Sequence, residues 1–175
     1  MTSTRGRMRV KSICAMALLS FGAMSPAWPV TEEGLENTDV VALTRFLEKE
    51  PFGKDAPRVR AQLLKWENTS KDVVDLVCPD LLGPIPDKSI PFSAELVAQF
   101  IFGSAAAQIA DPSTKGKLLP NQVAGMRSML KAYQAVRTQK SDVRIARLDE
   151  FAQHEADGTL EKFMQPLVAA LCTKK

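Results

Sequence analysis

The sequence predicts an all-α protein: a compact bundle of about six helices in a single domain, joined by one disulfide. Apolar residues recur every three or four positions through most of the chain, which is the spacing of one helix face. The β-branched residues of 71–78 would also suit a short strand, but no second strand candidate exists to pair with it. The 175 residues, 45% hydrophobic and 25% charged, suffice for one globular core.

Residues 1–27 have the pattern of an export signal. Four basic residues and no acidic residue precede an apolar stretch at 13–23, and Ser25-Pro26-Ala27 places small residues where a signal peptidase cuts. The apolar stretch is shorter than the roughly 20 residues that span a bilayer, so cleavage is favoured over a retained membrane anchor. We therefore expect an exported protein, periplasmic or secreted, with no stable membrane span in the mature chain.

Removal of this segment changes the charge of the protein. The full chain has 23 basic and 20 acidic residues, and four of the basic residues precede Trp28. The mature chain would carry a net charge of −1, which disfavours nucleic-acid binding through net charge. We expect no nucleic-acid partner and no cofactor.

The first two helices follow a flexible arm at 28–37 and open a helical domain at 38–175. Residues 39–50 place their apolar residues on one helix face, Thr38 or Asp39 can cap the start, and Pro51 ends the helix. Pro57 stands in the first turn of a second helix at 57–67.

The middle of the chain is less regular. Residues 71–78 suit a short helix or a strand, and we prefer the helix because a strand would lack a partner. Four prolines and Gly83 make residues 79–91 an extended connector. Ser93 is then expected to cap a helix that ends at Ala110.

The helix at 93–110 contains a run of small residues at 103–107, which we expect to face a neighbouring helix at close range. Further helices are predicted at 120–139, at 141–158 with Gly158 as its end, and from Thr159 onward, where Pro166 should kink or split the last one. The expected core residues are Leu43, Leu47, Leu63, Trp66, Phe100, Val123, Met126, Leu130, Tyr133, Leu148, Phe163 and Leu167.

Two cysteines, Cys78 and Cys172, remain after signal removal. An even pair in an exported protein predicts a disulfide, because oxidising compartments form and keep such bonds. Two buried free thiols are the alternative.

Five features of the sequence, spread over most of the chain after the signal, form a recognisable combination. They are CPDLLGP at 78–84, FIFGSA at 100–105, AGMRSMLKAY at 124–133, DGTL at 157–160, and Cys172 near the end. With these stretches the chain resembles a group of small, exported, all-helical bacterial proteins. The resemblance implies export and a single helical domain, and it implies no activity and no functional residue. At the level of architecture the chain is also similar to helical immunity proteins and acid-stress chaperones of the periplasm.

Two groups of residues are candidate sites. Glu150 and His154 are four positions apart and share a helix face with Asp149 nearby, so they could serve a metal-dependent or acid/base enzyme. Most zinc sites need three or four ligands, and no second His or Cys is near, so we assign no catalytic or metal residue. Arg137, Lys140, Arg144 and Arg147 recur at helical steps and form a candidate strip for an acidic partner, although an ordinary solvated face is the favoured explanation.

Asn68-Thr69-Ser70 matches a glycosylation acceptor, which matters only in a host that glycosylates. Because no catalytic constellation is present, the sequence favours an exported module that acts through its helical surface. Binding, immunity-like or chaperone-like activity is expected, with a protein partner, and an enzyme using Asp149, Glu150 and His154 is the alternative.

Overall fold

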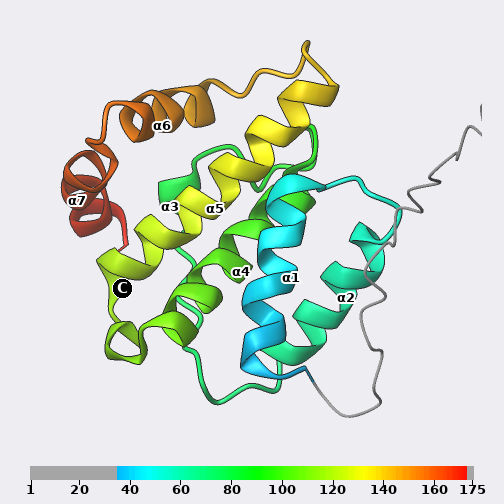
Figure 1. Cartoon of the computed structure of the whole chain (residues 1–175). Coiled ribbons are helices and arrows are strands. Elements are labelled where there is room, and N and C mark those ends of the chain that lie inside the picture. The colour runs from blue at the N-terminus through cyan, green and yellow to red at the C-terminus, as the bar shows by residue number, and fades with distance from the viewer. Residues whose placement is uncertain (1–34, 173–175) are drawn as a thin grey trace, which may run out of the picture. The chain divides into compact units, whose positions relative to one another are not determined.

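The computed structural model describes residues 35–172, and all regular structure in that range is helical (Figure 1). The helices are α1 (Asn37–Lys49), α2 (Ala56–Glu67), α3 (Pro79–Leu82), α4 (Ser93–Ala110), a short 3₁₀ turn η1 (Pro112–Thr114), α5 (Leu118–Gln139), α6 (Ala146–Ala156) and α7 (Leu160–Leu171). The predicted all-α bundle is confirmed. The predicted signal at 1–27 and most of the predicted arm lie outside the described residues.

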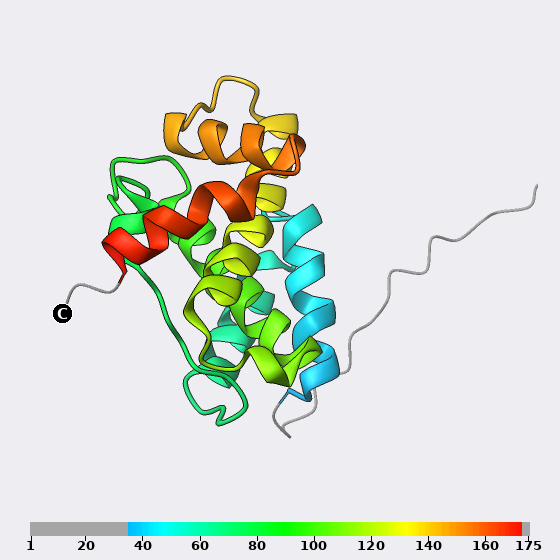
Figure 2. The ribbon, with the colours of Figure 1, turned by 90° about the vertical axis from the view of Figure 1, so that its left-hand side faces the viewer.

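The long helices α4 and α5 pack against each other in the middle of the helical unit (Figure 1). On one side α1 contacts both of them, and α2 packs beside α1. On the other side α6 and α7 contact α5, and α3 contacts α7 (Figure 2). Within residues 35–172, no helix combines the length and the apolar character needed to cross a membrane.

The contact between α4 and α5 depends on two glycines. A Cβ atom on Gly103 would lie 2.2 Å from the Cβ of Ser128, and one on Gly125 would lie 2.7 Å from the carbonyl oxygen of Phe100. The expected close approach of the small-residue run is therefore confirmed at Gly103. Ala106 and Ala107 differ, because they are half-buried and line a groove described below.

The core follows the predicted pattern closely. All of the expected core residues are buried except Trp66, Phe163 and Leu167, which are half-buried. The buried aromatic side chains of Phe100, Tyr133 and Phe151 belong to one apolar cluster that also includes much of α5.

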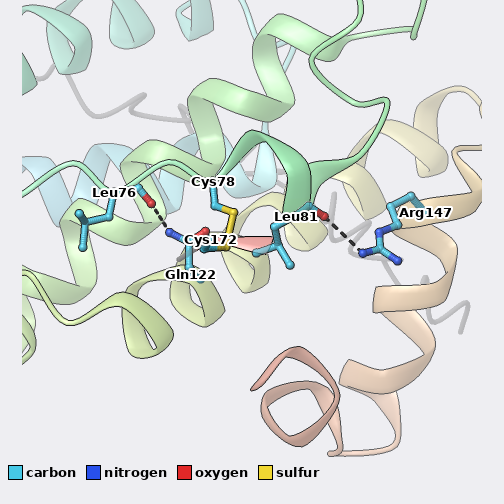
Figure 3. Close-up of a disulfide and its surroundings, with 6 residues drawn as sticks. All are labelled: Leu76, Cys78, Leu81, Gln122, Arg147 and Cys172. Carbon is cyan, nitrogen blue, oxygen red and sulfur yellow. Dashed lines mark hydrogen bonds between the residues drawn. A yellow bond between two sulfur atoms is a disulfide. The ribbon is translucent and has the colours of Figure 1, made fainter. Parts of the chain in front are cut away.

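A disulfide joins Cys78 to Cys172, with a Cα–Cα distance of 5.4 Å (Figure 3). Cys78 directly precedes α3 and Cys172 directly follows α7. The predicted bridge is thereby confirmed, and it fastens the end of the last helix to the middle of the chain.

The helix predicted at 71–78 is wrong. The segment is extended, because buried glutamine side chains bind its backbone in place of a helical ladder. Gln108 of α4 accepts the N–H of Val74 at 2.9 Å and donates to the carbonyl oxygen of Val74 at 3.0 Å. Gln122 of α5 donates to the carbonyl oxygen of Leu76 (Figure 3).

The connector at 79–91 is more ordered than predicted, since it contains α3. Pro79 is in the first turn, where its missing N–H costs nothing, and Gly83 ends the helix with a φ of 61°. Leu81, Leu82 and Ile85 are completely buried. The connector therefore contributes three side chains to the core, while most of its other residues are exposed.

The expected cap at Ser93 is also wrong. Phe92 precedes α4 in a left-handed conformation, with a φ of 61°, and Ser93 is already helical. The ring of Phe92 packs on Phe52 with a centroid distance of 4.6 Å. This aromatic contact holds the left-handed turn, and no side chain caps the helix.

The helix predicted at 141–158 begins later than expected, and the last helix is continuous. α6 begins at Ala146 rather than near Ser141, because the hydroxyl of Tyr133 accepts the N–H of Ile145 at 2.8 Å and fixes that residue as the N-cap. α7 continues through Pro166 without splitting. Pro166 is on the exposed side of α7, where its ring and the lost hydrogen bond disturb no packing.

Candidate functional site

The structure separates the acidic cluster that the sequence singled out. Asp149 accepts hydrogen bonds from the hydroxyl of Tyr133 at 3.0 Å and from Arg137 at 3.1 Å. Glu150 pairs with Arg147 at 2.9 Å. Asp149 therefore has its partners on α5, whereas Glu150 has a partner on its own helix, α6.

His154 makes a third, independent set of contacts. Its ring stacks on Phe163 of α7, with a centroid distance of 3.8 Å, and its Nδ1 lies 2.9 Å from the hydroxyl of Thr159. Among residues 35–172, no three His, Cys, Asp or Glu side chains lie together as a metal site would require. Asp149, Glu150 and His154 thus do not converge on one point.

The four residues of the predicted basic strip are all engaged within the protein. Arg137 pairs with Asp149, and Arg144 donates to the carbonyl oxygens of Ser141 and Val143. The ammonium group of Lys140 lies 5.7 Å from the ring centre of Phe92. These contacts leave the strip less free for a partner than its spacing suggested.

Arg147 is the most deeply engaged member of the strip. Besides its pair with Glu150, it lies 4.5 Å over the ring of Phe151 and donates to the carbonyl oxygen of Leu81 (Figure 3). Arg147 therefore ties α6 to α3, next to the disulfide.

A groove between α1, α4 and α5 combines more of the features of a binding site. Its volume is about 250 Å³. Gly103, Ala106, Ala107 and Ala110 of α4 and Ala124 of α5 form a floor of small residues. Its walls carry charged and polar side chains from α1 and α5, among them Arg45, Glu48, Arg127 and Lys131.

A chain of hydrogen bonds fixes one wall of this groove. Gln99, which is buried in α4, donates to the carbonyl oxygen of Thr44 at 3.2 Å and to the hydroxyl of Ser128 at 2.8 Å. Ser128 donates in turn to Glu48 at 2.8 Å, and Lys131 donates to the other oxygen of Glu48 at 3.0 Å. Because the side chain of Glu48 is only 11% exposed, these bonds stabilise a largely buried carboxylate and hold α1 in place.

Thr44 is the unsatisfied member of the groove. It is 2% exposed, and its hydroxyl has no hydrogen-bond partner among the described residues. A buried hydroxyl without a partner costs about 1–3 kcal/mol, and the hydroxyl oxygen of Thr44 is covered by the protein rather than open to the groove.

Two further hollows have a different character. One of about 450 Å³ is almost entirely apolar and lies on α6 and α7 around His154, Phe163 and Leu167. The other, of about 420 Å³, adjoins the disulfide and is lined by Leu76, Leu118 and neighbouring residues. The residues that line these two hollows include no buried polar group without a hydrogen-bond partner.

One carboxyl group outside the groove has a strongly altered pKa. Burial raises the pKa of Glu67, at the end of α2, to about 7, and the neighbouring carboxylate of Asp75 adds to the shift. Both effects disfavour the charged form of Glu67, so this carboxyl group holds its proton to a higher pH than an exposed glutamate does. Neither residue was a candidate in the sequence, because Asp75 lies in the segment that was expected to be helical.

Sequence reasoning also missed the groove. The available signal was Gln99, a polar residue inside the most apolar of the described helices, because a buried amide requires partners. The identity of those partners depends on α1 and α5 meeting α4, which local patterns do not encode.

Comparisons of the chain with protein-family models, with curated proteins and with solved structures found no match.

Proposed function

We propose that the protein is an exported binding protein that acts through its helical surface, as an immunity protein or a chaperone of the periplasm does. The observation that carries this proposal is the groove between α1, α4 and α5, with its floor of small residues and its fixed polar wall. Preorganised polar groups beside a small-residue floor suit recognition, since little order has to be created on binding.

Export is supported by the signal-like pattern at 1–27 and by the disulfide, a bond that oxidising compartments maintain. The alternative of an enzyme using Asp149, Glu150 and His154 has less support. Those three side chains are held by three separate sets of partners rather than around a common point.

The test is capture of a partner protein from the exported fraction of the host, with the groove intact or filled. In Ala106→Leu a larger side chain would occupy the groove, because Ala106 is half-buried in its floor. Ala61→Leu makes the same change at an exposed position of α2, outside the groove. Loss of a stoichiometric partner in Ala106→Leu alone supports the proposal, and equal capture by both variants rejects it.

A further inference from the structure

The charges around the groove indicate the chemistry of its ligand. Three of its wall residues, Arg45, Arg127 and Lys131, are cationic, and only Glu48 is anionic. Both oxygens of Glu48 already accept hydrogen bonds, from Ser128 and Lys131. The groove therefore has an excess of positive charge, and its one carboxylate is already satisfied.

Arg45 is the cation that remains for a ligand. Arg127 pairs with Glu155 at 3.1 Å, and Lys131 pairs with Glu48. Arg45 is exposed on α1, and among residues 35–172 it makes neither an ion pair nor a hydrogen bond. It directly follows Thr44, which lines the same groove.

The size of the groove limits what can enter it. About 250 Å³ is less than the usual volume of a site for a drug-sized molecule, and the floor consists of glycine and alanine. Such a space accepts one or two short side chains of an extended segment rather than a helix.

Resting on the proposed function, we propose that the groove binds an extended acidic segment of a partner protein. A carboxylate of that segment pairs with Arg45, whose planar guanidinium suits a two-pronged bond to a carboxylate. A small neighbouring side chain of the segment lies on the alanine floor.

The test uses protein purified after export, with its disulfide intact, and short blocked peptides of alternating alanine and glutamate. Binding is followed by NMR through the methyl signals of Ala106, Ala107 and Ala110. Matched peptides carry glutamine or lysine in place of glutamate. We expect the glutamate peptide to bind at least tenfold more tightly than the glutamine peptide and to shift these methyl signals.

Two variants locate the charge that is recognised. Arg45→Gln should remove the advantage of the glutamate peptide, whereas Lys49→Gln, which neutralises an exposed cation of α1 outside the groove, should retain it. Equal binding of all three peptides, preference for the lysine peptide, or an unchanged advantage in Arg45→Gln would overturn the proposal. Sodium isobutyrate binding as tightly as the peptide would also overturn it, in favour of a small free acid.

The two proposals fail in different ways. If Ala106→Leu loses its partner while Arg45→Gln keeps it, the groove binds a partner and the acidic assignment is wrong. If neither variant affects capture, the proposed function itself is wrong.

Discussion

Gly103 is the residue whose size most directly limits the distance between α4 and α5. In Gly103→Ala the new methyl group would meet the Cβ of Ser128 at 2.2 Å, so the helices must separate. We expect a loss of about 1–3 kcal/mol in the free energy of unfolding, typical of an overpacked core. Ala106→Leu on the same helix, which extends into the groove, should cost less than Gly103→Ala. Urea denaturation checks this, and equal midpoints for wild type and Gly103→Ala would contradict it.

The raised pKa of Glu67 predicts how the free energy of unfolding depends on pH. Its pKa is about 7 in the folded protein, raised from 4.5 by burial and by Asp75. The folded state therefore holds the proton more tightly than the unfolded state, so the contribution is complete below about pH 4.5 and is lost as the pH rises through 7. Because Glu67 is partly exposed, solvent screening reduces the effect to about 1 kcal/mol.

The variant Glu67→Gln removes this titrating group. Its melting temperature should fall less than that of the wild type between pH 5 and pH 8, as measured by thermal scans in matched buffers. Asp75→Asn should weaken the dependence in the same direction, since it removes the neighbouring charge. Glu161→Gln, at an exposed position on α7, serves as the control. A wild-type slope retained in Glu67→Gln would show that another group is responsible.

Among the elements, the extended segment before α3 depends on side chains from α4 and α5. Gln108 binds both backbone groups of Val74 and also accepts the N–H of Gly116 at 3.3 Å. In Gln108→Leu we expect the amides of Val74 and Gly116 to exchange with solvent at least tenfold faster, because their acceptor is gone. Hydrogen exchange followed by NMR measures this. Unchanged protection at Val74, with α5 intact, would show that the segment is held by other contacts.

Residues 71–78 also show the limit of prediction from local sequence patterns. Helices with one apolar face and a clear stop, such as α1 before Pro51 and α6 before Gly158, are predictable from local residues. Gly158 has a φ of 66° and leaves the N–H of Thr159 bonded to the carbonyl oxygen of His154, as a glycine after a helix commonly does. The conformation of residues 71–78 instead depends on Gln108 and Gln122, more than 30 positions away.

The candidate site was predictable to a smaller extent than the fold. The sequence placed Arg147 in the basic strip and Glu150 in the acidic cluster, and only the structure reveals that the two pair and that Arg147 reaches back to Leu81. Glu48 and Ser128 are 80 positions apart, and their hydrogen bond exists because α1 lies across α5. Polar contacts between residues so far apart in the sequence are set by how the helices pack, so local sequence patterns do not predict them.

For the whole molecule, the disulfide has the widest effect. Cys78 and Cys172 are 94 positions apart, and closing a loop of that length contributes about 4–5 kcal/mol in the chain-entropy model. On reduction, α3 and α7 should lose protection from hydrogen exchange before the centre of α5. Mass spectrometry of exchange with and without a reductant measures the order. Simultaneous loss of protection in α5 and α7 would contradict the prediction.

The position of the bridge also divides the molecule mechanically. Residues 78–172 form a covalent ring, whereas α1 and α2 precede it, joined to it by the backbone of residues 68–77 and packed against it by non-covalent contacts. A force applied between the two ends of the chain would peel α1 and α2 away, while the 94 positions within the bridge add nothing to the extension. Reduction would release that hidden length, about 310–340 Å when fully stretched. The groove lies on the boundary between the two parts, because α1 forms one wall while α4 and α5 belong to the ring, so pulling would open the groove before the ring is disturbed.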